Sequence, residues 1–189
     1  MTLFESIFAL ISIVTSLALA QLITGVVNVA RRIDRAKISA THAAWVWLAF
    51  VLVIGNWAAL FGAQADPDWP PGRILLWLLA MVSLYAFTAL VLPQSRASEA
   101  IDLKQFERRY GRSYIVAHNI FAVCGLLLIV GVRGFDLEYL RLAVFPLGAL
   151  VLGLIAMWAT RPWLKAAIAA SLAINGSVMT LGLLASMSS

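Results

Sequence analysis

Two histidines are the residues of this chain best suited to chemistry in or beside a membrane. His42 and His118 are the only histidines in 189 residues, and each lies at the start of a different long apolar run. Near neutral pH an imidazole can transfer protons, sense pH or ligate a metal. One imidazole from each of two helices, at matching depth, is also what a six-coordinate haem b iron needs. The sequence leaves three roles open for this pair: pH sensing, ligation of a single haem, and local hydrogen bonding at the membrane interface.

Signatures of catalysis are absent from the sequence. It has no His-Glu-x-x-His run, no glycine-rich phosphate loop and no pair of carboxylates within an apolar run, and Lys165 lies at the end of a run rather than in its middle. The single cysteine, Cys124, excludes an intrachain disulfide and a Cys-rich metal site. We therefore expect no enzymatic activity, no bound metal, and no cofactor unless the two histidines hold a haem.

Uncharged polar residues within the apolar runs are the remaining candidates for a functional site. A polar group buried in hydrocarbon without a partner costs several kcal/mol, so such residues either bridge helices or line a pathway. The one acidic residue within a run, Glu5, lies a turn from its end and is expected at the outer mouth of such a pathway. The uncharged candidates are Ser12, Thr15, Ser16, Gln21, Asn56 and Asn175.

Small residues recur in the last apolar run at spacings of four and three, which places them on one face of a helix. Such a stripe lets a second helix approach closely. It indicates tight packing either within one subunit or between the subunits of a homo-oligomer, which a bundle this small often forms to enclose a pathway. The stripe consists of Ala166, Ala170, Ala173, Ser177 and Thr180.

Six transmembrane helices must position all of these residues. The chain is 62% hydrophobic and 12% charged, whereas soluble domains average roughly 45–50% apolar and about 25% charged residues. About 20 apolar residues cross a bilayer as a helix, and lipid offers no other partner to the backbone. The sequence therefore predicts an all-α membrane bundle forming a single transmembrane domain over 1–189. Its spans are predicted near 3–30, 41–63, 74–92, 114–132, 139–159 and 163–187.

The stretch Leu17-Ala18-Leu19-Ala20 before Gln21 is similar to a signal-peptide cleavage site. A signal peptide would begin with basic residues and lose its apolar character near the cut. Here the only early charge is Glu5 and the run continues to Ala30, so we expect the first span to be retained.

Basic residues predict the orientation of the bundle. The joints after the first, third and fifth spans hold four, five and two Lys or Arg residues, against three on the opposite side. The positive-inside rule then places these joints in the cytoplasm and both termini outside a bacterial inner membrane. Because the charges are spread over three joints, we expect no nucleic-acid binding.

The longest cytoplasmic joint, 93–112, predicts a short amphipathic helix. It would begin at Ser98, with acidic residues in its first turn and Arg108 and Arg109 in its last. We expect this helix, 98–112, to lie on anionic headgroups or to dock a cytoplasmic partner.

One further pattern combines motifs from several parts of the chain: Phe4-Glu5-Ser6-Ile7, the stretches 11–14 and 18–25 after it, 42–61 in the second span, and 102–109. In these motifs the chain resembles a set of small six-span bacterial membrane proteins of unassigned function. The resemblance implies no activity, cofactor or site residue.

Together these observations favour a homo-oligomeric bacterial membrane channel or passive transporter for ions or small solutes. The small-residue stripe would pack its helices, and the amides and hydroxyls would line its pathway. Two alternatives stay open. One is a non-catalytic membrane subunit or sensor that docks a cytoplasmic partner through 98–112, and the other is a single-haem electron carrier through His42 and His118.

Overall fold

Six long helices make up the structure, a computed structural model that describes residues 3–65, 69–93, 102–133 and 137–187. All six are long and apolar enough to cross a membrane, and the described residues contain no strand. The prediction of an all-helical fold with six helices of membrane-spanning length and composition is confirmed. The helices are α1 (Leu3–Ala30), α2 (Ala40–Gly62), α3 (Pro71–Val91), α4 (Leu103–Arg133), α5 (Leu137–Trp158) and α6 (Pro162–Ser186), with short 3-10 turns η1 (Ile33–Arg35) and η2 (Ala63–Ala65).

Local signals set where several of these helices begin. Pro71 occupies the first helical position of α3, and Pro162 occupies that of α6. Proline's fixed φ fits this position, and its missing N–H is not needed there. Ser39 caps α2 by accepting a hydrogen bond from the His42 backbone N–H at 3.4 Å. The observed spans consequently start one to three residues before the predicted ones, except in α1 and α4.

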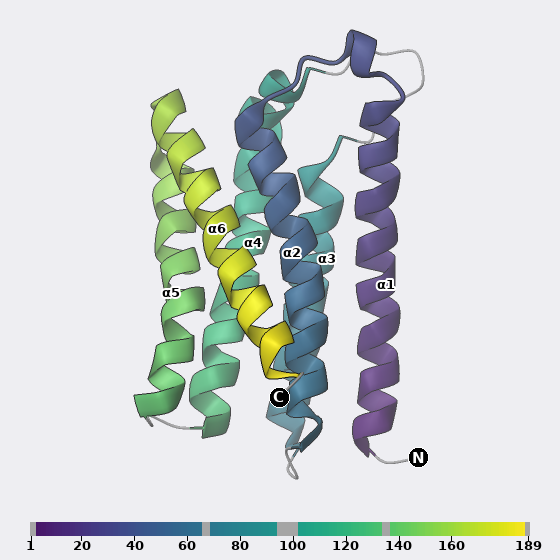
Figure 1. Cartoon of the computed structure of the whole chain (residues 1–189), viewed down its shortest axis with the longest axis vertical. Coiled ribbons are helices and arrows are strands. Elements are labelled where there is room, and N and C mark those ends of the chain that lie inside the picture. Colours follow the sequence, from purple (N-terminus) through teal and green to yellow (C-terminus); the bar gives the residue numbers. More distant parts are fainter. Residues whose placement is uncertain (1–2, 66–68, 94–101, 134–136, 188–189) are drawn as a thin grey trace.

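The helices run side by side, with α1 and α5 at opposite edges of the bundle (Figure 1). α2 packs chiefly against α6, α3 against α4, and α4 also against α5, while α1 packs on α3 and α2. Both chain termini lie at one end of the bundle, which we call the terminal end. Helices α1, α3 and α5 end at the other, which we call the basic end because it carries Arg31, Lys37, Lys104, Arg108 and Arg161.

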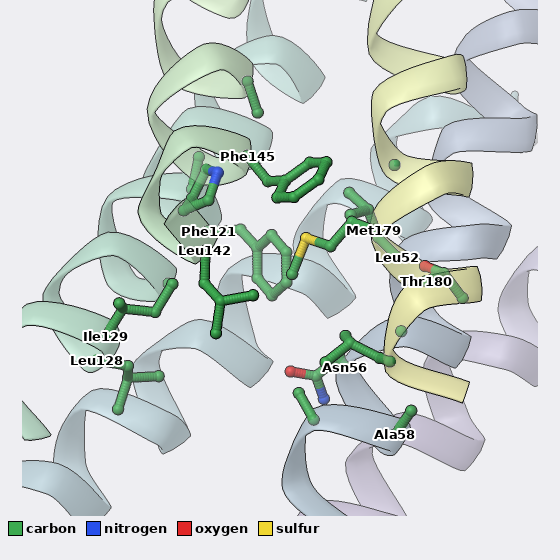
Figure 2. A pocket seen from close by; sticks show the side chains of 18 of the residues that line it. Leu52, Asn56, Ala58, Phe121, Leu128, Ile129, Leu142, Phe145, Met179 and Thr180 are labelled. Carbon is green, nitrogen blue, oxygen red and sulfur yellow. The ribbon is translucent and has the colours of Figure 1, made fainter. Parts of the chain in front are cut away.

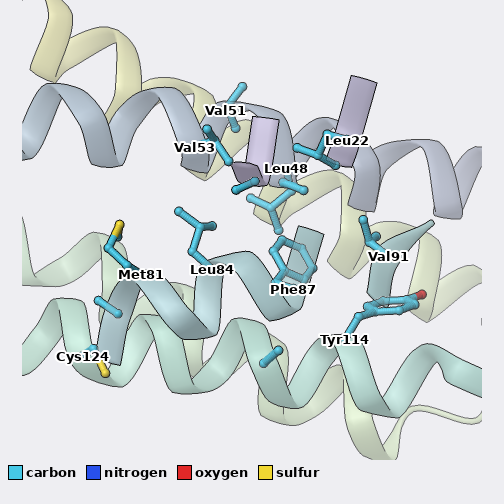
Figure 3. Close-up of a cluster of buried hydrophobic side chains, with 14 of the residues drawn as sticks. Leu22, Leu48, Val51, Val53, Met81, Leu84, Phe87, Val91, Tyr114 and Cys124 are labelled. Carbon is cyan, nitrogen blue, oxygen red and sulfur yellow. The ribbon is translucent and has the colours of Figure 1, made fainter. Parts of the chain in front are cut away.

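Most of the apolar core lies among α1, α2, α3 and α4 (Figure 3), and α6 adds Ile168, Ala169 and Leu172. Large apolar side chains also cover the outside of the bundle: Leu75, Ile174 and Leu181 are each 65% exposed or more. An apolar exterior suits lipid rather than water, because hydrocarbon solvates these side chains without cost. The fully buried core side chains include Leu22, Leu48, Val53, Met81, Leu84, Phe87 and Tyr114.

The small residues of α6 serve packing within one subunit. Thr180 Oγ1 donates a hydrogen bond to the Val51 carbonyl of α2 at 2.9 Å, and a Cβ added at Gly55 would meet that same hydroxyl. Ala173 is buried, whereas Ala170 is exposed. The packed face therefore includes Ala173 and Thr180 of the predicted stripe, but it leaves Ala170 outside. Ala166 and Ser177 are half-buried at its edges.

α4 differs from expectation, because it runs without a break from Leu103 to Arg133. The backbone N–H groups of Lys104 and Gln105 both donate to Asp102 Oδ1 at 3.0 Å, so Asp102 caps the helix. No proline follows in this stretch, and Gly111 costs a helix only about 1 kcal/mol relative to alanine. Residues 103–112 are thus the first turns of a membrane-length helix rather than a separate one, and 98–101 lie outside the described residues.

Candidate functional site

A cavity of about 550 Å³ lies between α2, α4, α5 and α6, with α3 closing one side. Its size falls within the roughly 300–1,000 Å³ typical of small-molecule sites. Figure 2 shows Phe121 of α4, Phe145 of α5 and Met179 of α6 directed toward one another, with Leu52 of α2 nearby. The cavity is therefore mostly apolar, and five helices contribute to its wall.

Small side chains on facing helices leave this space open. Gly125 of α4 lies opposite Pro146 of α5, and a Cβ added at this glycine would come 3.8 Å from the proline ring. Pro146, which lies inside α5, lines the cavity. Ala122, Ala149 and Gly176 also line it, so three helices present little more than backbone there. α2 and α4 make few contacts with each other, which separates the two walls.

Asn56 is the more buried of the two predicted asparagines that the structure places on the cavity wall. It is 7% exposed, and its Nδ2 donates to the thioether Sδ of Met81 at 3.1 Å. A thioether is a weak acceptor. Figure 2 shows the Asn56 carboxamide extending from α2 toward the enclosed space, below Met179. One amide hydrogen and the amide oxygen therefore remain for an occupant of the cavity.

Asn175 and His118 line the same cavity from α6 and α4. The Asn175 Nδ2 lies beside α5, 3.8 Å from where a Cβ on Gly148 would stand. Within the described part of the chain, no side-chain hydrogen bond engages Asn175. His118 Nδ1 pairs with Asn119 Oδ1 at 3.2 Å, which leaves its Nε2 for other partners. The structure thus brings together Asn56, Asn175 and His118, which lie far apart in sequence.

Arg73, absent from the sequence-based candidates, is the one charged residue on the cavity wall among the residues that the structure describes. It is 9% exposed, and its guanidinium carbon lies 4.2 Å from the centre of the Trp69 ring. Gly62 and Ser186, which are exposed, line the cavity near the same terminal end. The cavity therefore reaches the surface at the terminal end. The only sequence signal for Arg73 was its position directly before the apolar run 74–92.

An aromatic cluster of Trp45, Phe87, Tyr114 and His118 closes the side of the cavity toward the basic end. The rings of Trp45 and Phe87 lie 5.8 and 5.6 Å from the His118 ring, and Trp45 lies 5.4 Å from Tyr114. All four side chains are at most 2% exposed. Edge-on aromatic contacts at these separations are attractive, so the cluster forms a packed barrier.

His42 lies beyond this aromatic cluster, toward the basic end. Neither of its ring nitrogens has a hydrogen-bond partner, although the side chain is only 1% exposed. Its ring contacts Phe106 at 5.7 Å and Tyr114 at 6.4 Å. The expected local hydrogen bond is therefore present at His118 and absent at His42.

The ring contacts that connect the two imidazoles pass through Tyr114 and Trp45. A haem iron held by both histidines would need one imidazole on each of its faces. Both intervening rings would have to leave their present contacts. In the described residues no group of three or more His, Cys, Asp or Glu side chains could hold a metal ion.

The polar residues of α1 lie apart from the cavity, because α1 packs on α3 and α2 and supplies none of its described lining. Thr15 Oγ1 donates to the Ile11 carbonyl at 2.9 Å, and Ser16 Oγ donates to the Ser12 carbonyl at 2.8 Å. Hydroxyls can satisfy themselves on a carbonyl one turn back in this way. Gln21 is half-buried on the same helix, and Glu5 is exposed at the terminal end.

Two contacts join the α1–α2 loop to the start of α4, and we call them the clasp. Lys37 Nζ lies 3.5 Å from Asp102 Oδ2, and the Leu103 N–H donates to the Lys37 carbonyl at 3.1 Å. Close by, Ser39 Oγ donates to Glu107 Oε2 at 3.3 Å. The clasp thus couples the α2 cap to the first turns of the helix that also forms one cavity wall.

These features define the class: a bundle of six helices, each long and apolar enough to cross a membrane, with a ligand-sized cavity inside it. No protein-family model, no curated protein and no solved structure matches the chain. The resemblance of its motifs to small bacterial membrane proteins therefore stays a prediction.

Proposed function

We propose that the protein is a non-catalytic membrane sensor that binds a small molecule in its cavity and signals through α4. The observation that carries this proposal is the position of α4. The helix supplies His118, Phe121 and Gly125 to the cavity wall and continues unbroken to Leu103 at the basic end. A change of packing at the cavity is therefore transmitted along one rigid element to the clasp.

Orientation is part of the proposal. The basic end faces the cytoplasm of a bacterial cell and both termini face outward, by the positive-inside rule. The cavity then opens toward the outer side, where Gly62 and Ser186 are exposed. The first turns of α4 present Lys104, Arg108 and Arg112 to the cytoplasm, where they would meet anionic headgroups or a partner.

A cavity-filling substitution tests the coupling before any ligand is known. In Ala149→Trp an indole from α5 enters the cavity, displaces α4 and loosens the clasp. We expect backbone amide exchange over 102–107 to accelerate at least about fivefold, the lower bound of typical allosteric coupling. Ala170→Trp adds the same side chain to the exposed face of α6, and exchange should stay unchanged. Equal exchange in both variants and the wild type would rule out the coupling.

Partner docking has its own test. Chemical cross-linking in native membranes should capture one stoichiometric protein on the wild type and lose it with Arg108→Glu combined with Arg112→Glu, both exposed positions. A charge-reversed variant that keeps the same captured protein, or a wild type that captures none, would remove this part of the proposal.

A passive transporter for small solutes is the second candidate, favoured by a cavity that reaches one surface and ends at a packed aromatic cluster. Transport would require this cluster to open. The pathway would lie within one subunit, so a homo-oligomer is not needed for it and stays a prediction. Solute flux in proteoliposomes that exceeds empty vesicles and is abolished by Ala149→Trp, but kept by Ala170→Trp, would favour transport over sensing.

A further inference from the structure

We infer that the cavity binds a neutral molecule with an apolar body and a single carbonyl or hydroxyl head, which pairs with Asn56. This inference names the ligand class of the proposed sensor and rests on that function only for its consequence, because the binding itself is measured separately. Apart from Arg73 near the terminal end, no charged residue among those that the structure describes lines the cavity. The deep wall therefore offers no counter-ion to a charged group.

The body of the ligand is defined by the apolar wall. Phe121, Phe145 and Met179 meet across the space from three helices (Figure 2). Aromatic and thioether side chains pack well on flat or branched apolar groups. A charged molecule would lose its hydration among these residues without recovering it, whereas an apolar one gains by leaving water.

The head of the ligand is defined by the Asn56 amide. Asn56 is 7% exposed and its only described hydrogen bond is to the Met81 thioether, so a second N–H and the Oδ1 are unused. An amide left unsatisfied in an apolar site carries a free-energy cost that a complementary group removes. An amide both donates and accepts, so either a carbonyl or a hydroxyl can pair with it.

Asn175 lines the same cavity at another level. Gly176 packs on Leu48 and Val51, and Gly55 packs on Thr180. Asn175 precedes the first contact and Asn56 follows the second, so about six residues, or roughly 9 Å of helix rise, separate the two amides along the α2–α6 interface. A single head therefore pairs with Asn56, with the body directed toward Phe121 and Phe145.

Benzophenone is a suitable probe, because it joins one carbonyl to two apolar rings and forms covalent cross-links under ultraviolet light. Purified protein in proteoliposomes is irradiated with it, and the labelled residues are mapped by mass spectrometry. We expect saturable labelling of cavity residues such as Leu52 and Met179, its loss in Ala149→Trp, and its retention in Ala170→Trp. Labelling spread evenly over lipid-facing residues and insensitive to Ala149→Trp would overturn the site.

Competition by two analogues tests the head group. Diphenylmethane has the same shape without the carbonyl, and we expect it to compete about three- to tenfold more weakly, the worth of one hydrogen bond. Asn56→Leu should remove that difference while benzophenone still labels the cavity. Equal competition by diphenylmethane on the wild type, or tighter competition by the anionic 4-benzoylbenzoate, would overturn the ligand class.

The outcomes separate binding from function. Saturable labelling together with unchanged amide exchange over 102–107 would leave the ligand class intact and refute the sensor. Accelerated exchange in Ala149→Trp without saturable benzophenone labelling would leave the sensor intact and refute the ligand class.

Discussion

The polar side chains within the apolar runs have different hydrogen-bonding environments in the structure, although the sequence does not distinguish them. Asn56 lies on the cavity wall with unused amide capacity, whereas Thr15 and Ser16 satisfy their hydroxyls on their own helix. A hydroxyl can reach a backbone carbonyl one turn away, and an asparagine does so less readily in a helix. The amides were therefore the more informative part of the sequence-based site. Arg73 was missed because a basic residue near a span end also fits a purely topological role.

The two histidines give a prediction at this scale. We expect purified protein, expressed with haem supplied, to show no Soret absorption band. The reason is that Tyr114 and Trp45 fill the ring contacts between His42 and His118. A Soret band that disappears in both His42→Ala and His118→Ala would establish a haem site and contradict the packing described above.

At the scale of the helices, the lengths of the apolar runs predicted all six spans, but they did not predict where α4 begins. Helix length beyond the membrane depends on a cap, and Asp102 was expected inside a helix beginning at Ser98 rather than in front of one. The clasp could not be predicted either, because it joins Lys37 to a residue 65 positions along the chain. A packed face of small residues on α6 was predicted, but the observed face includes only some of the predicted residues. Helix periodicity fixes the position of a face only to within about a residue.

The cap of α4 gives a pH prediction. The Gln105 backbone hydrogen bond, followed by Lys37, holds the pKa of Asp102 below its ordinary range. A lowered pKa means that the cap's contribution is present above the ordinary aspartate value of about 3.9 and is lost as the pH falls through the lowered value. Exchange of the Gln105 amide, corrected for its intrinsic pH dependence, should therefore accelerate in strong acid. Asp102→Asn keeps the capping oxygen and should lose this dependence; the same acid response in that variant would contradict the assignment.

The contact between α2 and α6 gives a stability prediction. Gly55→Ala places a methyl group against Thr180 and disturbs its hydrogen bond to Val51. We expect this substitution to destabilise the bundle by about 1–3 kcal/mol. Gly182→Ala is the matched control, because nothing lies within 4 Å of its added Cβ, and a helical alanine is otherwise favoured. Unfolding by sodium dodecyl sulfate measures both; equal stability would show that the interface is loose.

At the scale of the whole molecule, the sequence predicted the number of apolar helices, but it could not predict how these helices are arranged. Six apolar runs indicate six crossings, but apolar surfaces of similar shape can pair in many orders. The pairing of α2 with α6 places Asn56 and Asn175 on the wall of one cavity, which five helices enclose together. The sequence could therefore propose uncharged polar residues for a site, but it could not show where they lie in the fold.

Orientation gives a prediction for the whole bundle. With Cys124→Ala as background, a cysteine at Lys104 should resist a membrane-impermeant thiol reagent in intact cells. A cysteine at Gly62 should react, because that exposed position lies at the terminal end. The opposite labelling pattern would invert the topology and turn the mouth of the cavity toward the cytoplasm.

The central claim, that an occupant of the cavity acts on the basic end through α4, is tested most directly by amide exchange over 102–107 in proteoliposomes, with and without saturating benzophenone. We predict acceleration of at least about fivefold in the wild type and no response in Ala149→Trp, whose cavity is already filled. Confirmed benzophenone binding with unchanged exchange in the wild type would contradict the account.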